Sequence, residues 1–456
     1  MQTLRVRMYR QGLGDCFLLT YRAEEGDERT QVLIDSGVLK GTDDAETKMR
    51  AVAENVRDET GGRVDILVST HEHWDHLSGF LQAQNVWESI TFGQVWLAWT
   101  EDPQDELAKE LRDRKRKRLN GLVAAAKLAR GATADRLDGL LGFEGELGAG
   151  ATKTTAKALE WVKDREATVR FLQPGDQLFD LPGLGGIRVY VLGPPHDSRL
   201  IKRSDPSKRA SEVYELAGSG GSQQGFLAAS EALAEGEVPK TQPFDPFFRV
   251  EEAAAAKEAF FEEHYYAAAD EWRRIDQDWL GYASELALQL DSDTNNTSLV
   301  LAFELGSQGD VLLFPGDAQV GNWLSWEALE WKFSEGTGTG TRTVRSADLL
   351  GRTVLYKVGH HASHNATLRE KGLELMSSGR LTAMIPVNRV TAGKMGWLMP
   401  FPPLHKRLVE KTNGRVIDAE TGLDDAKPHE LSQAGWTQFL ARTDVQPGWV
   451  DYTLEW

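Results

Sequence analysis

The chain has 456 residues, of which 41% are hydrophobic, so one large domain with insertions or two domains are expected. The formal net charge of −17 disfavours a general electrostatic attraction to nucleic acid and excludes most high-affinity, sequence-specific DNA binders. Bound cations or local basic patches still permit a nucleic-acid substrate. The single cysteine, Cys16, excludes an internal disulfide framework and fits a reducing compartment.

The sequence favours a soluble protein. Residues 1–7 alternate between charged or polar and apolar side chains, as an exposed strand does, and lack the apolar stretch of a signal peptide. No run approaches the ~20 apolar residues that a membrane span needs. We therefore expect a cytoplasmic location and no membrane partner.

The first part of the chain predicts strands separated by turns. Apolar runs predict strands at 4–8, 16–21 and 32–34. Between the first two lies a turn in which Gly12 and Gly14 permit backbone conformations closed to other residues. Asp15 belongs to the same turn.

Asp35 follows the third of these strands directly. A carboxylate at the end of a buried strand is most often a cap or a turn former. It can also orient a metal-binding histidine from behind, and the histidine-rich loop that follows favours this second interpretation.

That loop comes after a helix predicted at 45–60 and an apolar strand at 64–69. Its ligand-type side chains are His71, His73, Asp75 and His76. Three imidazoles and a carboxylate so close together cannot all find partners in an apolar core. In extended or turn geometry the side chains of His71 and His73 point to the same side of the chain. Asp75 and His76 can then surround a second metal position. The spacing therefore predicts two adjacent metal positions.

A first helical insertion is predicted at 104–166, where leucines recur at helical spacing. It contains a run of basic residues at 112–118, which we interpret as a solvated helix face; the alternative is a patch that contacts phosphate. Further strands are predicted at 169–172 and 187–192.

His196 follows the last of these strands, and we expect a hydrogen-bonded loop histidine there rather than a metal ligand. A second insertion is predicted at 200–290, with one or two long helices after residue 250. Lids, partner surfaces and dimer arms are all open as roles for the two insertions.

The second half of the chain supplies further ligand-type residues at strand ends. Apolar runs at 299–303 and 311–314 predict a hairpin that ends at Asp317. A strand at 354–359 precedes a polar loop that contains His360, His361, Ser363, His364 and Asn365. Six of the ten histidines thus fall in two strand-end clusters, which points to function because surface histidines would be scattered.

The order of these residues resembles the motifs of the metallo-β-lactamase superfamily. The pieces are Asp35, His71-x-His73-x-Asp75-His76, Gly316-Asp317 and His360-His361. A narrower set resembles the hydrolase domain of the bacterial competence DNA-uptake channel and its stand-alone soluble relatives. That set is Gly12-x-Gly14-Asp15, Asp35-Ser36-Gly37, Asn296-x-Ser298, Gly316-Asp317-Ala318, His360-His361-Ala362-Ser363, and the segments 399–404 and 414–422. The resemblance covers roughly half to three-fifths of the chain.

The resemblance implies an α/β (α+β) fold: a four-layer αβ/βα sandwich of two mixed sheets with helices outside. Residues 1–456 would form this metallo-β-lactamase-like domain, interrupted by the helical insertions at 104–166 and 200–290. A metal site would lie at one edge of the sheets.

The resemblance also implies a ligand set for two divalent ions. His71 and His73 would hold the first ion, and Asp317 would bridge the two. Asp75, His76 and one of His360 and His361 would hold the second, with Asp35 and Asp15 as orienting residues behind. Many superfamily members have a histidine where this chain has Asn295 and Asn296. Because nitrogen ligands are fewer here, manganese is expected as an alternative to zinc.

These residues imply a metal-dependent hydrolase that uses an activated water. Asp75 or Asp317 would accept hydrogen bonds from that water, and whichever of His360, His361 and His364 does not bind metal would donate a proton or stabilise an oxyanion. Ser363, Asn365 and Asn296 would contact the substrate.

The first hypothesis is a phosphodiesterase or nuclease, because the relatives it resembles act on DNA. Single strands or small phosphodiesters are open as substrates alongside duplex DNA. The second hypothesis is a hydrolase of carboxylic esters, phosphocholine-type esters or lactones, which the same chemistry serves. The third is a non-catalytic binding module whose insertions carry the function.

Overall fold

The computed structural model describes most of the chain outside the second predicted insertion. The described residues are 2–24, 29–128, 131–145, 151–178, 184–203, 250, 252–267, 281–334, 341–423, 427–428 and 431–456. The chain divides into two compact units. The first consists of Met1–Leu111, Gly142–Gly218 and Ser292–Trp456, and the second of Arg112–Leu141 and Ser219–Asp291.

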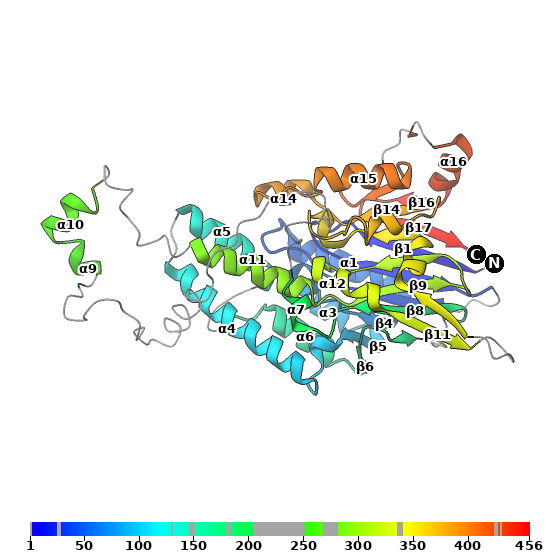
Figure 1. Ribbon diagram of the computed structural model, residues 1–456, viewed down its shortest axis with the longest axis horizontal. Coiled ribbons are helices and arrows are strands. Elements are labelled where there is room, and N and C mark those ends of the chain that lie inside the picture. Colours follow the sequence, from blue (N-terminus) through cyan, green and yellow to red (C-terminus); the bar gives the residue numbers. More distant parts are fainter. Residues whose placement is uncertain are drawn as a thin grey trace. The chain divides into compact units, whose positions relative to one another are not determined.

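The first unit has a mixed α/β fold built on two large mixed sheets (Figure 1). The larger sheet has eight strands in the order β16-β17-β1-β2-β3-β4-β5-β6. Neighbours are antiparallel from β16 to β3 and parallel from β3 to β6. Its strands are β1 (Thr3–Tyr9), β2 (Phe17–Arg22), β3 (Arg29–Ile34), β4 (Arg63–Val68), β5 (Thr91–Ala98), β6 (Thr168–Leu172), β16 (Thr443–Val445) and β17 (Trp449–Glu455).

The second sheet has seven strands in the order β15-β14-β13-β10-β9-β8-β7. Its neighbours are parallel from β15 to β10 and antiparallel from β10 to β7, which includes the predicted β9–β10 hairpin. The strands are β7 (Gln177–Leu178), β8 (Ile187–Gly193), β9 (Val300–Leu305), β10 (Val311–Phe314), β13 (Thr353–Lys357), β14 (Thr382–Ile385) and β15 (Val416–Asp418). A separate two-stranded sheet pairs β11 (Glu330–Ser334) with β12 (Thr341–Arg345).

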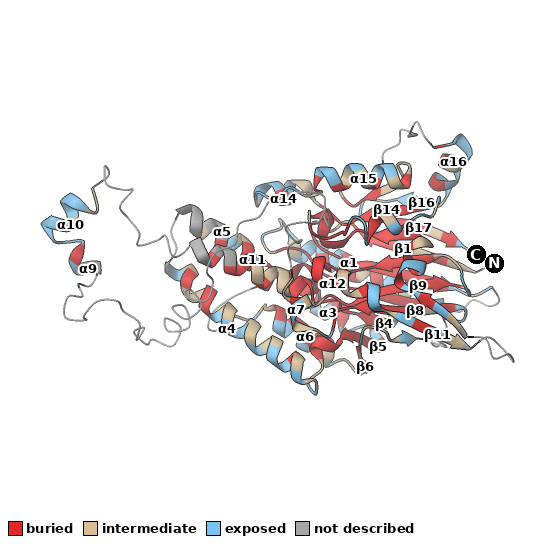
Figure 2. Cartoon of the chain, in the orientation of Figure 1, coloured by how far each residue is buried: buried red, intermediate tan, exposed pale blue. Residues whose placement is uncertain are grey.

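One hydrophobic core joins the two large sheets. Alternate residues of their strands face each other, because successive side chains in a strand point to opposite faces. The rings of Phe17 and Phe314, one from each sheet, meet edge to face with centroids 5.7 Å apart. Figure 2 shows the strands of both sheets largely buried.

Helices cover the other face of each sheet. The eight-stranded sheet packs against α1 (Ala45–Thr60), α2 (Trp74–Gln82), α3 (Gln84–Trp87) and α6 (Thr155–Lys163). The seven-stranded sheet packs against α12 (Val320–Ser325), α13 (Ser346–Gly351) and α15 (Pro402–Thr412). The remaining elements of the first unit are α7 (Ser198–Ile201), α14 (Arg389–Lys394), α16 (Gln433–Ala441) and the 3₁₀ turns η1 (Trp99–Glu101), η2 (Gly142–Glu144), η6 (Trp326–Ala328), η7 (Gly359–Ala362) and η8 (Leu373–Leu375).

The predicted insertions contain helices. The segment 104–166 contains α4 (Glu106–Leu128), α5 (Gly131–Leu141) and α6, and the last of these packs in the core of the first unit. In the segment 200–290 the structure describes α9 (Glu252–Ala255), α10 (Ala259–His264) and most of α11 (Gly281–Asn295). The rest of that prediction, at 204–249, 251 and 268–280, lies outside the described residues.

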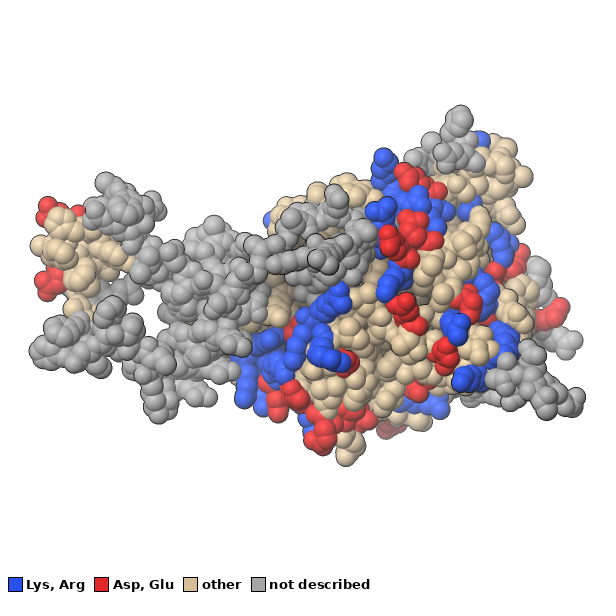
Figure 3. Space-filling view, in the orientation of Figure 1, with Lys and Arg blue, Asp and Glu red and all other residues tan. Residues whose placement is uncertain are grey.

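Charged residues of both signs are interspersed on the face of the molecule in Figure 3. Within the basic run of α4, Arg116 pairs with Asp113 one turn earlier at 2.9 Å, and both side chains are more than half exposed. This is the geometry of the solvated helix face predicted for the run. Among the described residues, every helix is too short or too polar to cross a membrane.

The inter-sheet core predicts a large effect of truncation at Phe314. Phe314→Ala removes a ring that is 2% exposed, and we expect the free energy of unfolding to fall by about 3–5 kcal/mol. Val445→Ala is the matched control, because Val445 is 39% exposed and its truncation should change stability by less than ~0.5 kcal/mol. Urea denaturation followed by tryptophan fluorescence measures both. Equal effects of the two substitutions would contradict the assignment of the core.

Candidate metal centre

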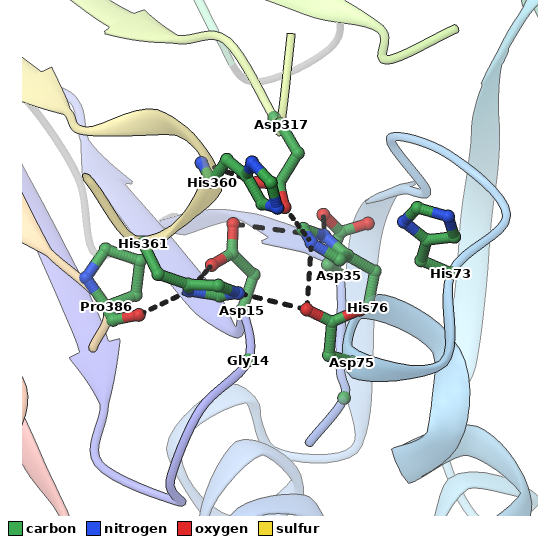
Figure 4. Close-up of polar contacts among 12 residues, drawn as sticks. Gly14, Asp15, Asp35, His73, Asp75, His76, Asp317, His360, His361 and Pro386 are labelled. Carbon is green, nitrogen blue, oxygen red and sulfur yellow. Dashed lines mark hydrogen bonds and ion pairs between the residues drawn. The ribbon is translucent and has the colours of Figure 1, made fainter. Parts of the chain in front are cut away.

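The strand-end loops of both sheets meet at one place. In the eight-stranded sheet the parallel neighbours β3 and β4 end just before Asp35 and the loop 69–76. In the seven-stranded sheet the parallel neighbours β10 and β13 end just before Asp317 and His360. Parallel neighbours finish at the same edge of a sheet, so each sheet brings two polar loops to its edge. Figure 4 shows the side chains of these loops pointing toward one another.

Four of the predicted ligands form one buried group: Asp75, His76, Asp317 and His361. Each offers a ligand atom, and these atoms lie within 4.8 Å of one another. His76 Nε2 is 3.1 Å from Asp317 Oδ2, and His361 Nε2 is 3.0 Å from Asp75 Oδ2. All four side chains are at most 1% exposed. The structure thus assigns His361 to this group, where the sequence left His360 and His361 as alternatives.

Asp35 makes the contacts expected of an orienting carboxylate. It accepts hydrogen bonds from the backbone N–H of Thr70 at 2.8 Å and from the Thr70 hydroxyl at 2.6 Å. Its Oδ2 lies 2.8 Å from His76 Nδ1, so the other ring nitrogen of His76 faces the group. Asp35 has a φ of 56°, and such a strained conformation at a non-glycine residue needs support from its surroundings.

Glycines allow the loops at the edge of the eight-stranded sheet to pack closely against one another. A Cβ atom on Gly14 would lie 2.7 Å from the Asp75 carbonyl oxygen, and one on Gly37 would lie 2.3 Å from the Asp75 carbonyl carbon. Backbone hydrogen bonds from Asp15 to Asp75 and from Ser36 to His76 join the same segments. The glycines of the predicted turns are therefore required by close backbone approach.

Lys357 is a site residue that the motif analysis missed. It ends β13, is 1% exposed, and its Nζ donates to the Gly316 carbonyl oxygen at 2.8 Å and contacts Asp317 Oδ1 at 3.2 Å. The same ammonium group forms an ion pair with Asp15. The sequence could have indicated this residue, because Lys357 lies inside the apolar run 353–358 and a buried ammonium group needs anionic partners.

The charges in this group shift pKa values strongly. Burial by itself would lower the pKa of His76, but Asp317, Asp75, Asp15 and Asp35 together raise it well above its usual value. Burial also opposes the charged form of Asp317, yet the neighbouring charges hold the pKa of that carboxyl well below its usual range.

His361 and Lys357 follow the same pattern. The hydrogen bond to Asp75 raises the pKa of His361 against the effect of burial. The carboxylates of Asp15 and Asp317 raise the pKa of Lys357, which burial alone would lower. The neighbouring cations therefore keep the carboxylates of Asp75 and Asp317 ionised, whereas burial raises the pKa of Asp15.

The other two predicted ligands of the histidine loop lie next to this group. His71 Nε2 and His73 Nδ1 are 3.1 Å apart, and both side chains are buried. The rings of His71 and His76 have centroids 4.2 Å apart. Burial lowers the pKa of His71 well below its usual value, so this imidazole is neutral and offers a lone pair. The pair presents two nitrogen atoms at a separation that adjacent ligands of one cation have.

His360, the other of the two alternatives that the sequence left open, is not a member of the group of four. His360, His361 and Ala362 have φ values of 42°, 52° and 62°, which form a left-handed turn, and the two imidazole rings have centroids 6.1 Å apart with an interplanar angle of 52°. The ring of His360 contacts the Ser363 hydroxyl through Nδ1 at 2.8 Å, and burial lowers its pKa to about 4. Its backbone N–H donates to Asp317 Oδ1 at 2.9 Å.

The residues predicted to contact substrate, Ser363, Asn365 and Asn296, have hydrogen-bond partners within the protein. Ser363 donates to Asn365 Oδ1 at 3.0 Å, and both residues support the ring of His360. The amide of Asn296 donates to the carbonyls of Ile201 and Arg203 and accepts from the backbone N–H groups of Gln319 and Asn322. The side chain of Asn296 thus connects these loops by hydrogen bonds, and both its amide nitrogen and its amide oxygen have partners.

Two further histidines lie outside the group. His364 is half-buried, and its ring meets that of Phe401 edge to face. His196 lies 2.8 Å from Asp105 Oδ2 through Nε2, which confirms the prediction of a hydrogen-bonded loop histidine.

The donor set fits a divalent cation. Two imidazole nitrogens and two carboxylates are ligands that zinc and manganese both accept. Asp75 Oδ1 is buried and has no hydrogen-bond partner in the structure. A buried carboxylate oxygen without a partner is costly, and a coordinated cation would satisfy it. These four residues can therefore hold a metal ion.

Comparison with known proteins adds no relative. The sequence matches no protein-family model, and no curated protein matches it significantly.

Metal binding at this group should strengthen as pH rises. In the metal-free protein the hydrogen bond to Asp75 raises the pKa of His361, so its imidazole holds its proton more strongly than an ordinary histidine does, and a cation must displace that proton. We expect the affinity for Zn²⁺ to increase through the neutral range, with protons released on binding. Calorimetric titration in two buffers of different ionisation enthalpy measures the release. An affinity independent of pH would contradict a histidine-containing site.

Removal of Lys357 should destabilise the metal-free protein selectively. Lys357→Met leaves the carboxylates of Asp15 and Asp317 buried without the lysine ammonium group. We therefore expect the free energy of unfolding to fall by about 3–5 kcal/mol. Saturating Zn²⁺ should restore part of the lost free energy of unfolding, since the metal binds only the folded state. Urea denaturation with chelator and with Zn²⁺ measures both effects. Lys163→Met, which breaks the partly exposed pair with Glu101, is the control and should cost at most ~1 kcal/mol. Similar losses in the two variants would contradict this role.

Proposed function

We propose that this chain has the four-layer αβ/βα fold of the metallo-β-lactamase superfamily and acts as a metal-dependent hydrolase. The support for the fold is architectural: two mixed sheets share one core and carry helices on their other faces. The support for the family is the order of the motif residues along the chain.

One observation carries the functional proposal. Asp75 and His361 are 286 residues apart in the sequence, yet His361 Nε2 lies 3.0 Å from Asp75 Oδ2. His76 and Asp317, also from different sheets, complete the same buried group. Four ligand-type side chains from two sheets thus form one buried group, which supports a metal-dependent active site.

The proposed ligands divide between two cation positions. Asp75, His76, Asp317 and His361 would hold one cation, and His71 and His73, together with Asp317, would hold the other. Two divalent ions in these positions, zinc or manganese, would lower the pKa of a water molecule between them and stabilise charge on the attacked phosphorus.

The chain's own groups then position the reaction. Asp75 and Asp317 accept hydrogen bonds from the attacking water. His364 lies in the same loop as His361 and is less buried than the ligands, so we propose it as the proton donor to the leaving oxygen. The carboxylate of Asp35 keeps the second nitrogen of His76 directed at the cation.

The proposed target is a phosphodiester bond, because the motif set resembles enzymes that act on DNA. The net charge of −17 and the mixed charges on the face in Figure 3 favour single strands or small phosphodiesters over long duplexes. The activity would be that of a phosphodiesterase or nuclease.

A substrate screen tests this proposal. Metal-depleted protein is loaded with Zn²⁺ or Mn²⁺ and offered a bis-aryl phosphate, single-stranded DNA, an aryl carboxylic ester and a lactone. We expect phosphodiester cleavage only with metal, and a fall in kcat/KM of at least ~100-fold for Asp317→Asn and His361→Ala, because each removes a ligand of the reactive centre.

His196→Ala is the matched control, since this histidine lies outside the group and should leave activity unchanged. A preference for the carboxylic ester or the lactone would contradict the phosphodiester assignment. A protein that binds neither metal would contradict the hydrolase proposal and favour a non-catalytic binding module.

A further inference from the structure

The histidines of the site share one arrangement: one ring nitrogen faces the centre and the other is held from behind. The rear nitrogen, Nδ1, lies 3.1 Å from the Thr70 hydroxyl in His71 and 2.8 Å from Asp35 in His76. In His361 it lies 2.6 Å from the Pro386 carbonyl oxygen, to which it must donate. Such contacts fix the tautomer of a ligating imidazole and its direction.

His73 shows the same arrangement, but the roles of Nδ1 and Nε2 are exchanged. Its Nδ1 faces the centre, 3.1 Å from His71 Nε2. Its Nε2 faces away, toward the carboxylate of Glu144, with 4.0 Å between Nε2 and Oε1. The two side chains are 1% and 4% exposed, so the carboxylate acts on the ring with little screening by water.

Glu144 belongs to a short segment that is built onto the histidine loop. It ends the turn η2, and the next residue, Gly145, forms a β-bridge with Thr154. A Cβ atom on Gly145 would lie 2.7 Å from the indole of Trp74, which shows how closely the segment approaches α2.

Aromatic packing fixes the same segment. The ring of Phe143 has its centroid 5.5 Å from that of His73, and it stacks on Trp397 at 5.1 Å. Close by, Thr155 donates to Glu72 Oε1 at 3.1 Å. The position of the Glu144 carboxylate is therefore set by packing on both sides.

We propose that Glu144 is the positioning residue of His73. Its carboxylate keeps the proton of the imidazole on Nε2, which leaves the lone pair of Nδ1 directed at the point shared with His71 Nε2. Loading of the His71–His73 position with a divalent cation thus depends on a residue outside every motif that the sequence shares with known hydrolases. The inference rests on the proposed function in one respect, that these two histidines are cation ligands.

The first test needs no metal. Protein labelled with ¹⁵N-histidine is studied by long-range ¹H–¹⁵N NMR after treatment with chelator, with His73→Gln used to assign the signal. We expect the Nε2–H tautomer of His73 in the wild type and a mixture of tautomers in Glu144→Leu. A wild-type His73 protonated on Nδ1, or an unchanged tautomer in the variant, would overturn the proposal.

The second test measures metal stoichiometry and affinity, with Zn²⁺ alone as the probe in calorimetric titrations. We expect two ions in the wild type, and in Glu144→Leu a 10–100-fold weaker affinity for one ion and an unchanged affinity for the other. Glu144→Gln keeps a hydrogen-bond acceptor and should lose less. If the leucine variant does not fold, the glutamine variant supplies the comparison, with a fall in the affinity of one ion as the supporting result.

Glu101→Gln is the matched control, because Glu101 is also buried but pairs with Lys163 away from the histidines. Its metal affinities should equal those of the wild type. Equal affinities in all variants would show that Glu144 only packs. A wild type that binds no Zn²⁺ would instead contradict the proposed function, and the tautomer of His73 would still decide the role of Glu144.

Discussion

The structure depends on burying four carboxylates in one small region. Asp15, Asp35, Asp75 and Asp317 are each at most 2% exposed. Carboxylates so far from water would unfold the protein or take up protons if no cations accompanied them. Lys357 provides a permanent positive charge, and nearby imidazoles provide titratable ones, which explains why the pKa values of His76 and Asp317 move in opposite directions. The polar loops can close over one another because this charge is balanced.

The inter-sheet core decides how precisely the two halves of this cluster meet. Asp75 and His76 follow a strand of one sheet, whereas Asp317 and His361 follow strands of the other. No covalent link near the site holds the sheets in register, so the packing of apolar side chains between them does so. A shift of the sheets by even one ångström would separate atoms that now lie about 3 Å apart, and it would spoil the site before it unfolded the protein.

Sequence patterns predicted many of the strands, the hairpin and the histidine loop, because alternation and turn residues are local properties. They did not predict β11, β12, β14, β16 or β17. The resemblance to the metallo-β-lactamase superfamily, rather than these local patterns, implied that Asp75 and Asp317 belong to one site. The patterns could not separate His360 from His361, because the two residues belong to a left-handed turn that residues with side chains rarely adopt. The loop partners of Asn296 could not be predicted, because they are remote from it in sequence. Glu144 carried no signal at all, since its role depends on where tertiary packing places the turn η2.

The turn formed by His360, His361 and Ala362 has a further consequence. Three successive residues with side chains occupy a region of backbone space that suits glycine, at a cost of order 1 kcal/mol each. Selection for heat resistance alone would therefore tend to introduce glycine here, with Ala362→Gly the simplest change. The same change would free the backbone next to His361 and loosen the direction of its imidazole. In this loop, higher thermal stability and a fixed direction of the His361 imidazole therefore favour different residues at position 362.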